Sequence, residues 1–251
     1  MLAPAVLAAL SGLLLGSFLN VVVHRLPRGE SLVSPGSHCP GCATPLKPWD
    51  NVPLLSWLTL RGRCRFCSGP ISARYPLVEL LTAALFTGVV LVRHSTAGLV
   101  LGLGLVVVLV PAALIDLEHR IIPNRLMAPA AGFALLAGTI LDPAGEPERL
   151  IAALAAGGFL LAAALAYPKG MGMGDVKLAA VLGLFLGRGV AAALLVALLA
   201  GVLIGAGIML VRGVKAGRKT AVPFGPMLGL GGLVGVFTGA ATVSWYLATF
   251  V

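Results

Sequence analysis

The sequence predicts an all-α polytopic membrane protein of about eight transmembrane helices, with one small polar loop domain between helices one and two. Hydrophobic residues make up 59% of the chain and charged residues only 11%, whereas a soluble domain carries about 25% charged residues. So few charges could not cover the surface of a water-soluble globule of 251 residues. The apolar residues also occur in blocks long enough to cross a bilayer, which takes about 20 residues per helix.

Eight apolar blocks follow one another along the chain: Leu2–Val23, Leu77–Val92, Ala97–Ile115, Leu126–Leu141, Leu150–Tyr167, Val176–Gly187, Gly189–Val211 and Phe224–Val251. The sixth block is short and is separated from the seventh only by Arg188, so seven spans are an alternative. No basic segment precedes the first block, and Arg25 and Arg28 follow it instead. We therefore expect a retained span with its N-terminus outside, and not a cleaved signal peptide.

The basic residues predict the orientation of the helices. With eight spans, the connections 24–76, 116–125, 168–177 and 212–223 share one face. They hold 15 of the 18 basic residues: Arg25, Arg28, Lys47, Arg61, Arg63, Arg65, Arg74, Arg120, Arg125, Lys169, Lys177, Arg212, Lys215, Arg218 and Lys219. The positive-inside rule makes this face cytoplasmic. A basic loop could also bind nucleic acid, but the positive-inside rule accounts for all four connections together. We therefore expect no nucleic-acid partner.

The opposite face keeps few charges. The basic ones are Arg93, Arg149 and Arg188, and the acidic ones are Asp142, Glu146 and Glu148. The three acidic residues stand near two prolines, and we expect them to be solvated loop charges. The predicted domains are a first transmembrane helix over 1–23, a cytoplasmic loop domain over 24–76 and a membrane-embedded helical bundle over 77–251.

All four cysteines lie in the loop domain. They form two pairs, Cys39-Pro-Gly-Cys42 and Cys64-Arg-Phe-Cys67, with 21 residues between the pairs. Two such knuckles suit tetrahedral zinc, and four thiolates leave no open position for catalysis. The cytosol keeps thiols reduced, which argues against disulfides. We expect structural zinc held by Cys39, Cys42, Cys64 and Cys67; redox chemistry or unligated thiols are the alternatives.

Two aspartates near the cytoplasmic ends of the helices stand out among nine acidic residues. Asp175 follows the run from Gly170 to Gly174, in which glycines alternate with methionines. It stands directly before a predicted apolar helix. Asp there can serve as a helix N-cap, but a cap does not require three alternating glycines. Glycines permit a close approach of another backbone or of an extended substrate.

Asp116 closes the third apolar span, where a carboxylate faces the negative end of the helix dipole at a cost of about 0.3–1 kcal/mol. Local stability therefore does not explain it. If Asp116 and Asp175 meet across the bundle, one proton is shared between them. The ionised member can then take a proton from water while the protonated member donates to a scissile carbonyl.

Other protease chemistries are missing from the sequence. It has no H-E-x-x-H zinc motif and no G-x-S-x-G elbow. Among the remaining residues near this face, Glu79 is given a supporting role, because acidic residues near membrane interiors are seldom idle. Gly172, Gly174 and Lys177 are the other supporting candidates.

Several motifs in order resemble the type IV prepilin leader peptidase family of GxGD-type intramembrane aspartic proteases. They are Gly172–Asp175 with Asp116 and Ile122–Asn124, the opening Gly16–Val21 with Arg25–Pro27, the paired cysteines, Arg74–Thr82, and Pro223–Pro226. The resemblance implies Asp116 and Asp175 as the catalytic pair. It also implies cleavage of short basic leader peptides from type IV prepilins or type II secretion pseudopilins, in the inner membrane of a bacterium.

Many bacterial members of that family also methylate the new N-terminus with S-adenosyl-L-methionine, and the cysteine loop is associated with this bifunctional form. The family often has Gly after Thr82, where this chain has Ala83. The cofactor-binding residues and the oligomeric state are unknown from the sequence. Two other function classes are compatible with parts of it. They are a polytopic transporter, and a membrane-tethered zinc-binding assembly factor.

Overall fold

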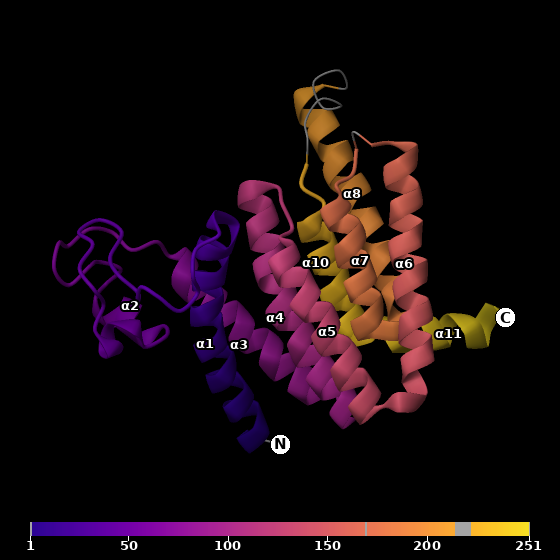
Figure 1. The fold of residues 1–251 in the computed structure, drawn as a ribbon, viewed down its shortest axis with the longest axis horizontal. Coiled ribbons are helices and arrows are strands. Elements are labelled where there is room, and N and C mark those ends of the chain that lie inside the picture. Colours follow the sequence, from indigo (N-terminus) through magenta and orange to yellow (C-terminus); the bar gives the residue numbers. More distant parts are fainter. Residues whose placement is uncertain (1, 169, 214–221, 251) are drawn as a thin grey trace. The chain divides into compact units, whose positions relative to one another are not determined.

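The computed structural model describes residues 2–168, 170–213 and 222–250, and these residues are mostly helical (Figure 1). Within these ranges there is no β-strand, only two isolated bridges, so the all-α class is confirmed. Lys169, Lys215, Arg218 and Lys219, four of the basic residues assigned to the cytoplasmic face, lie outside the described residues. The chain forms two compact units, Met1–Val92 and Arg93–Val251.

The first unit is built on two long helices, α1 (Leu2–Arg25) and α3 (Arg74–Val92), which pack along each other. Small residues permit this close approach, since a Cβ added at Gly16 would lie 2.7 Å from the Cα of Glu79. The amide of Asn20 donates a hydrogen bond of 3.2 Å to the carbonyl oxygen of Tyr75. Helix α3 belongs to this compact unit, whereas the sequence analysis assigned residues from 77 onward to the helical bundle. That domain boundary remains a prediction.

The loop between α1 and α3 carries the short helices η1 (Leu26–Arg28), η2 (Pro48–Asn51) and α2 (Leu55–Thr59). Buried Arg25 donates to the carbonyl oxygens of Ser31, at 3.0 Å, and Gly36, at 3.3 Å. At the other end, the backbone N–H of Leu54 donates to Glu79 Oε2 over 2.7 Å. Side chains from both long helices therefore hold the loop.

The second unit is a bundle of helices. Its members are α4 (Thr96–His119), α5 (Asn124–Leu141), α6 (Glu146–Ala166), α7 (Met173–Leu186), α8 (Val190–Arg212), α10 (Gly225–Val234) and α11 (Ala240–Phe250), with a π-helical turn at Gly235–Gly239. The glycine-rich α10 packs against α4, α7 and α8. A Cβ added at Gly232 would lie 2.7 Å from Leu182 and 2.8 Å from Leu109.

The chain reverses direction between α7 and α8. Gly187 has φ +55°, a left-handed value that favours glycine. Along α10, Gly232 lies against Leu182 and Gly235 against Leu186, so α7 runs parallel to α10. Over the same stretch, Gly201 lies against Phe224 and Gly239 against Gly189, so α8 runs antiparallel to α10. The two helices thus run in opposite directions, as Figure 1 shows.

The predicted number of eight spans is not confirmed. Among the described residues, six helical runs are long and apolar enough to cross a membrane, or seven if a final pair bent by 67° counts as one span. The run Met173–Arg212 counts once, although it contains the reversal between α7 and α8. Its first part, α7, has 14 residues and a length of about 21 Å, which is shorter than the hydrocarbon core of about 30 Å.

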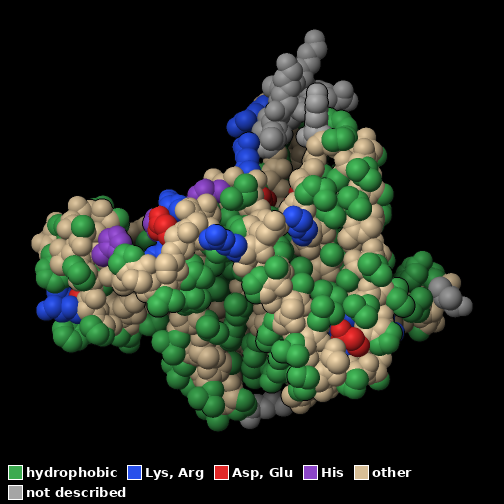
Figure 2. Space-filling view, viewed as in Figure 1, with side chains coloured by type: hydrophobic (Ala, Val, Ile, Leu, Met, Phe, Trp, Pro, Cys, Tyr) green, Lys and Arg blue, Asp and Glu red, His purple; other side chains and the backbone are tan. Residues whose placement is uncertain are grey.

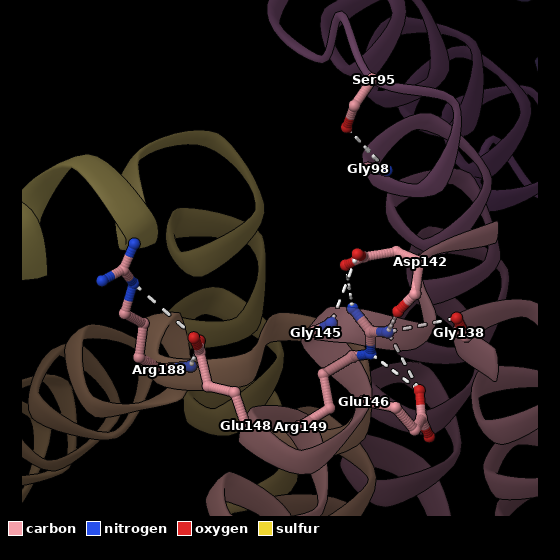
Figure 3. Close-up of polar contacts among 9 residues, drawn as sticks. All are labelled: Ser95, Gly98, Gly138, Asp142, Gly145, Glu146, Glu148, Arg149 and Arg188. Carbon is pink, nitrogen blue, oxygen red and sulfur yellow. Dashed lines mark hydrogen bonds and ion pairs between the residues drawn. The ribbon is translucent and has the colours of Figure 1, made fainter.

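The charges at one end of the second unit form a network around Arg149 (Figure 3). The Arg149 side chain is buried in the first turn of α6 and binds Asp142 at 2.8 Å and Glu146 at 3.0 Å. It also donates to the carbonyl oxygen of Gly138 near the end of α5. The expectation of a solvated loop charge was therefore wrong for Glu146, whose side chain is 12% exposed and pairs with the buried guanidinium. Asp142 pairs with the same guanidinium but keeps 43% of its side chain exposed, and Glu148, beside Arg188, keeps 51%.

The two ends of the second unit carry different groups. Asp142 and Arg149 lie at one end, where α5 meets α6. Asp116 and Asp175 lie at the other end, where α4 stops and α7 begins. In the space-filling view of this unit, basic side chains gather at the upper end and the flank below is largely apolar (Figure 2). This distribution is that of a bundle surrounded by lipid.

Candidate active site and cysteine cluster

Asp116 is buried in the last turn of α4, with 6% of its surface exposed. Its Oδ2 accepts a hydrogen bond of 2.8 Å from the backbone N–H of Gly225, at the start of α10. Helix α4 ends directly afterwards, because Arg120 adopts a left-handed φ of +54° and its N–H donates to the Asp116 carbonyl oxygen. An aspartate at the unfavourable end of one helix dipole is thus bound by the N-terminus of another helix.

Asp175 lies in the first turn of α7, with 8% of its surface exposed. The helix begins at Met173, and Gly172 occupies the N-cap position. Asp175 therefore does not cap the helix from outside, as one sequence-based interpretation suggested. Its Oδ2 accepts a hydrogen bond of 3.2 Å from the backbone N–H of Gly172. A carboxylate in the first turn interacts favourably with the helix dipole.

The structure brings the two aspartates to one cavity of about 360 Å³. The cavity is lined by residues of the α4–α5 connection and of the segment that enters α7: Asp116, Arg120, Ile121, Ile122, Asn124, Gly172, Met173, Gly174, Asp175 and Lys177. Within the described part of the chain, no hydrogen bond involves Oδ1 of Asp116 or Oδ1 of Asp175. Each carboxylate is therefore fixed through one oxygen and has the other available.

The supporting candidates beside the pair occupy different positions. Gly174 packs tightly against the α4–α5 connection, since a Cβ there would lie 3.0 Å from the Cβ of Ile122. Gly172 has an extended backbone, with φ −84°, that any residue adopts, and an added Cβ would lie 3.5 Å from Asp175 Oδ2. Lys177 donates a hydrogen bond of 2.8 Å to the side chain of Asn124. A lysine at the start of α7 thus joins the two segments that frame the cavity.

Glu79 is buried in α3 of the first unit, where it binds the loop through Leu54 N. The structure adds two groups that the sequence-based candidates did not include. They are the N–H of Gly225, which binds Asp116, and Asn124, which binds Lys177. Both stand in motifs noted in the sequence, Pro223–Pro226 and Ile122–Asn124, but a backbone donor leaves no side-chain signal.

The four cysteines gather at one point in the first unit. One ligand atom from each of Cys39, Cys42, Cys64 and Cys67 lies within 4.8 Å of all the others. The sulfurs of Cys39 and Cys67 are 3.8 Å apart, and all four thiols are free of disulfides. With Zn–S bonds of about 2.3 Å, the edge of a tetrahedron is about 3.8 Å. The cluster therefore has the donor set and the spacing of a four-thiolate metal site.

The two knuckles have the same backbone geometry. In each, the N–H of the first cysteine bonds to the carbonyl oxygen five residues later, Thr44 in the first knuckle and Gly69 in the second. An isolated bridge flanks each knuckle, and the residue after the second cysteine has φ near +55°. These residues are Ala43, at +55°, and Ser68, at +56°. Two similar turns therefore present the four sulfurs in two equivalent pairs.

The thiols influence one another's ionisation. A hydrogen bond with Thr44 lowers the pKa of Cys42 to about 6. The Gly69 N–H alone would lower the pKa of Cys67, but the neighbouring Cys42 and Cys64 outweigh it and raise this pKa to about 11. Four adjacent thiols cannot all ionise without a positive charge between them. A bound cation would supply that charge, which fits the cluster to a metal ion.

Two family models match the chain. Residues 10–93 match the bacterial peptidase A24 N-terminal domain, and residues 103–210 match the type IV leader peptidase family. The first match covers most of the first compact unit, and the second covers α4 to α8 with both aspartates. No solved structure matches the chain.

Curated relatives agree with the family models. A prepilin leader peptidase/N-methyltransferase of Aeromonas hydrophila is 37% identical over 98% of this chain and 94% of the relative. The protein of the same name from Myxococcus xanthus is 43% identical over 86% of this chain and 66% of the relative. The one from Pseudomonas aeruginosa is 34% identical over 95% of this chain and 91% of the relative. On these matches, the chain belongs to the type IV leader peptidase family.

Proposed function

We propose that the chain is a prepilin leader peptidase in which Asp116 and Asp175 are the catalytic pair. The observation that carries the proposal is their convergence: from α4 and α7, both buried carboxylates line one cavity, and each is fixed by a backbone N–H through a single oxygen. The names of the relatives support the same activity. Neither the family nor the cavity favours a transporter or an assembly factor.

Peptide hydrolysis follows from one shared proton. The ionised aspartate takes a proton from a water molecule as the water oxygen bonds to the scissile carbonyl carbon. The protonated aspartate donates its proton to the carbonyl oxygen, which gives a tetrahedral adduct. The aspartate that took the proton from water then passes it to the amine nitrogen as the C–N bond breaks, and the other aspartate takes back a proton from one hydroxyl group, which leaves a carboxylic acid. The N–H groups of Gly225 and Gly172 each hold one oxygen of a carboxylate, which leaves the other oxygen available to the water and to the scissile carbonyl without reorganisation.

The substrate proposed is a prepilin or pseudopilin precursor with a short basic leader. Such a precursor places its scissile bond at the start of a hydrophobic helix, and the proposed site lies at the ends of membrane helices. The positive-inside rule places this end of the bundle in the cytoplasm. Because the chain is basic, with a net charge of +9, anionic headgroups would have to offset repulsion of the leader.

N-methylation of the new N-terminus is the second activity in the names of the relatives, and we assign it to this chain as well. S-adenosyl-L-methionine supplies an electrophilic methyl group when bound. The cysteine cluster takes structural zinc, because four thiolates close its coordination sphere and leave no position for a reactant. The first unit, with which the N-terminal family model aligns, contains this cluster.

The proposal is tested with the purified chain in lipid, a prepilin and labelled S-adenosyl-L-methionine. Asp116→Asn and Asp175→Asn keep an oxygen that accepts the N–H of Gly225 or Gly172 but remove the ionisable group. We expect each variant to fold and to lose cleavage by several orders of magnitude. Glu148→Gln, which changes a half-exposed carboxylate at the opposite end of the bundle, is the matched control and should cut normally.

Mass spectrometry of the product separates the two activities. Wild type should release the leader and add one methyl group to the new N-terminus. Cleavage retained by either asparagine variant would remove that aspartate from the mechanism. A processed product without the methyl group would contradict the second activity and leave the first intact.

A further inference from the structure

The loop between α1 and α3 exposes large apolar side chains that its own fold does not cover. Trp49 is 59% exposed, Leu55 60% and Leu58 54%, and Val52 is exposed as well. We call these four residues the α2 surface. Leu55 and Leu58 are three residues apart in α2 and share one side of the helix. Four large apolar side chains exposed within ten residues of a polar loop indicate an interaction surface.

The depth of this surface follows from the bond between Leu54 and Glu79. Helix α3 has 19 residues and is about 28 Å long, so it needs its whole length to cross a hydrocarbon core of about 30 Å. Glu79 is the sixth residue of α3 and therefore lies about 7.5 Å beyond its first residue along the axis. Its carboxylate accepts the N–H of Leu54, the residue directly before α2.

Helix α2 is thus held at the level of the second turn of α3 and not above the membrane. Interfacial helices lie about 5–10 Å deep, at the boundary of headgroups and acyl chains. Leu77, Leu80 and Leu81 of α3 are also exposed at this level of the helix, as expected of a helix turn that lies within the bilayer. In Figure 1 the loop lies beside the C-terminal half of α1 and not beyond its end.

The charges around the surface fit the same partner. Residues 24–76 contain seven basic and two acidic residues, and one of the acidic residues, Asp50, is paired with Arg65 at 2.7 Å. The ammonium group of Lys47 lies 5.4 Å from the ring centre of Trp49. Tryptophan beside lysine or arginine is typical of residues at the membrane–water interface.

We propose that the cysteine loop docks on the bilayer, with the α2 surface inserted into the interface and the basic side chains among anionic headgroups. The Glu79–Leu54 hydrogen bond sets the depth of this insertion. The metal cluster would then be carried on a domain fixed at the membrane surface, beside the helices, and not on a freely moving loop in water.

The test places the full-length chain, at low protein-to-lipid ratio, in vesicles of phosphatidylethanolamine and phosphatidylglycerol. Part of the lipid is brominated, either high on the acyl chain or near its end. The emission of Trp49 is the difference between wild type and Trp49→Phe, because Trp57 and Trp245 are common to both. We expect the shallow bromines to quench most of this emission, the deep bromines to quench less of it, and aqueous acrylamide to quench it weakly.

Leu55→Ser with Leu58→Ser should reduce the quenching by shallow bromines, while helicity and metal content stay those of wild type. Val33→Ser, which changes an exposed apolar residue of the same loop outside the α2 surface, is the matched control and should leave the quenching unchanged. Two results in wild type would overturn the proposal. Strong quenching by acrylamide without quenching by bromine places the loop in water. Protection from both quenchers shows that protein, such as a second copy, covers the surface.

Discussion

Asp116 shows how a single residue can be placed against its local preference. The carbonyl end of α4 disfavours a negative charge by about 0.3–1 kcal/mol, and burial disfavours it further. Among the described residues, the hydrogen bond that compensates comes from the N–H of Gly225, which reaches the carboxylate because α10 begins there without a side chain. A Cβ at residue 225 would lie 2.6 Å from Asp116 Oδ2 and 2.9 Å from its Cβ.

Gly225→Ala therefore tests the position of Asp116 without removing the carboxylate. The added methyl group should displace the side chain, and a displacement near 1 Å at a reacting group costs about 100-fold in rate. We expect prepilin cleavage to fall by about that factor in a protein that is still folded. Gly205→Ala, at a position where an added Cβ meets nothing within 4 Å, should cut at the wild-type rate. Equal rates for the two variants would show that Gly225 does not position the aspartate.

At the scale of single residues, the sequence predicted which groups lie together better than the contacts that hold them. The meeting of Asp116 and Asp175 at one cavity was predictable because each carboxylate stands at the end of an apolar block, where a charged residue is unfavourable unless it has a role. The four cysteines were predictable from their spacing. The Gly225 donor was not, since a backbone N–H has no residue type, and the burial of Arg149 was not, since its partners come from a neighbouring helix end.

At the scale of elements, hydropathy locates the helices but does not show how neighbouring helices are joined. The blocks at 176–187 and 189–211 were read as two spans, and the structure has two helices that reverse direction at Gly187–Gly189, although the first of them, α7, has only 14 residues. The left-handed backbone of Gly187 makes that reversal possible. Glycines in an apolar segment serve helix packing, tight turns and caps alike, so the sequence alone does not separate these uses.

The α5–α6 hairpin is closed by Arg149, which bonds Gly138 O and Asp142 at the end of one helix and Glu146 at the start of the next. The hydrogen bond from Arg149 lowers the pKa of the Asp142 carboxyl below its usual range. Its folded-state pKa is thus below the unfolded value of about 3.9. The stabilisation is complete above that value and is lost as the pH falls through the folded-state pKa.

Asp142→Asn should therefore unfold at a lower temperature than wild type at neutral pH. The difference should shrink as the pH falls below the ordinary range of aspartate, because protonation then removes the same ion pair from wild type. Thermal unfolding in lipid nanodiscs at several pH values measures it. Glu148→Gln, which removes a half-exposed pair with an N–O distance of 3.9 Å, should change stability little. A difference between Asp142→Asn and wild type that persists at acid pH would contradict the assignment.

At the scale of the whole molecule, two compact units carry two kinds of chemistry. The first unit holds four thiols in a loop tied to α1 and α3, and the second holds both aspartates. The composition predicted a membrane protein, and the cysteine spacing predicted the cluster. The pairing of α3 with α1 was not predictable, because it rests on the fit of small residues such as Gly16 against the backbone at Glu79. Such a fit depends on packing, which periodicity does not encode.

Removal of the metal should therefore unfold the loop and leave the second unit intact. Structural zinc sites of this kind supply about 10–16 kcal/mol at neutral pH, which is more than the total stability of a typical small domain. We expect about one zinc per chain, lost in Cys39→Ser with Cys64→Ser, and rapid trypsin cleavage after Arg61 and Arg63 in that variant. The helical signal of the second unit should persist, and Thr59→Ser, an exposed change in the same loop, should behave as wild type. A zinc content near zero in wild type, or the same trypsin pattern with and without the metal, would contradict a metal-dependent loop.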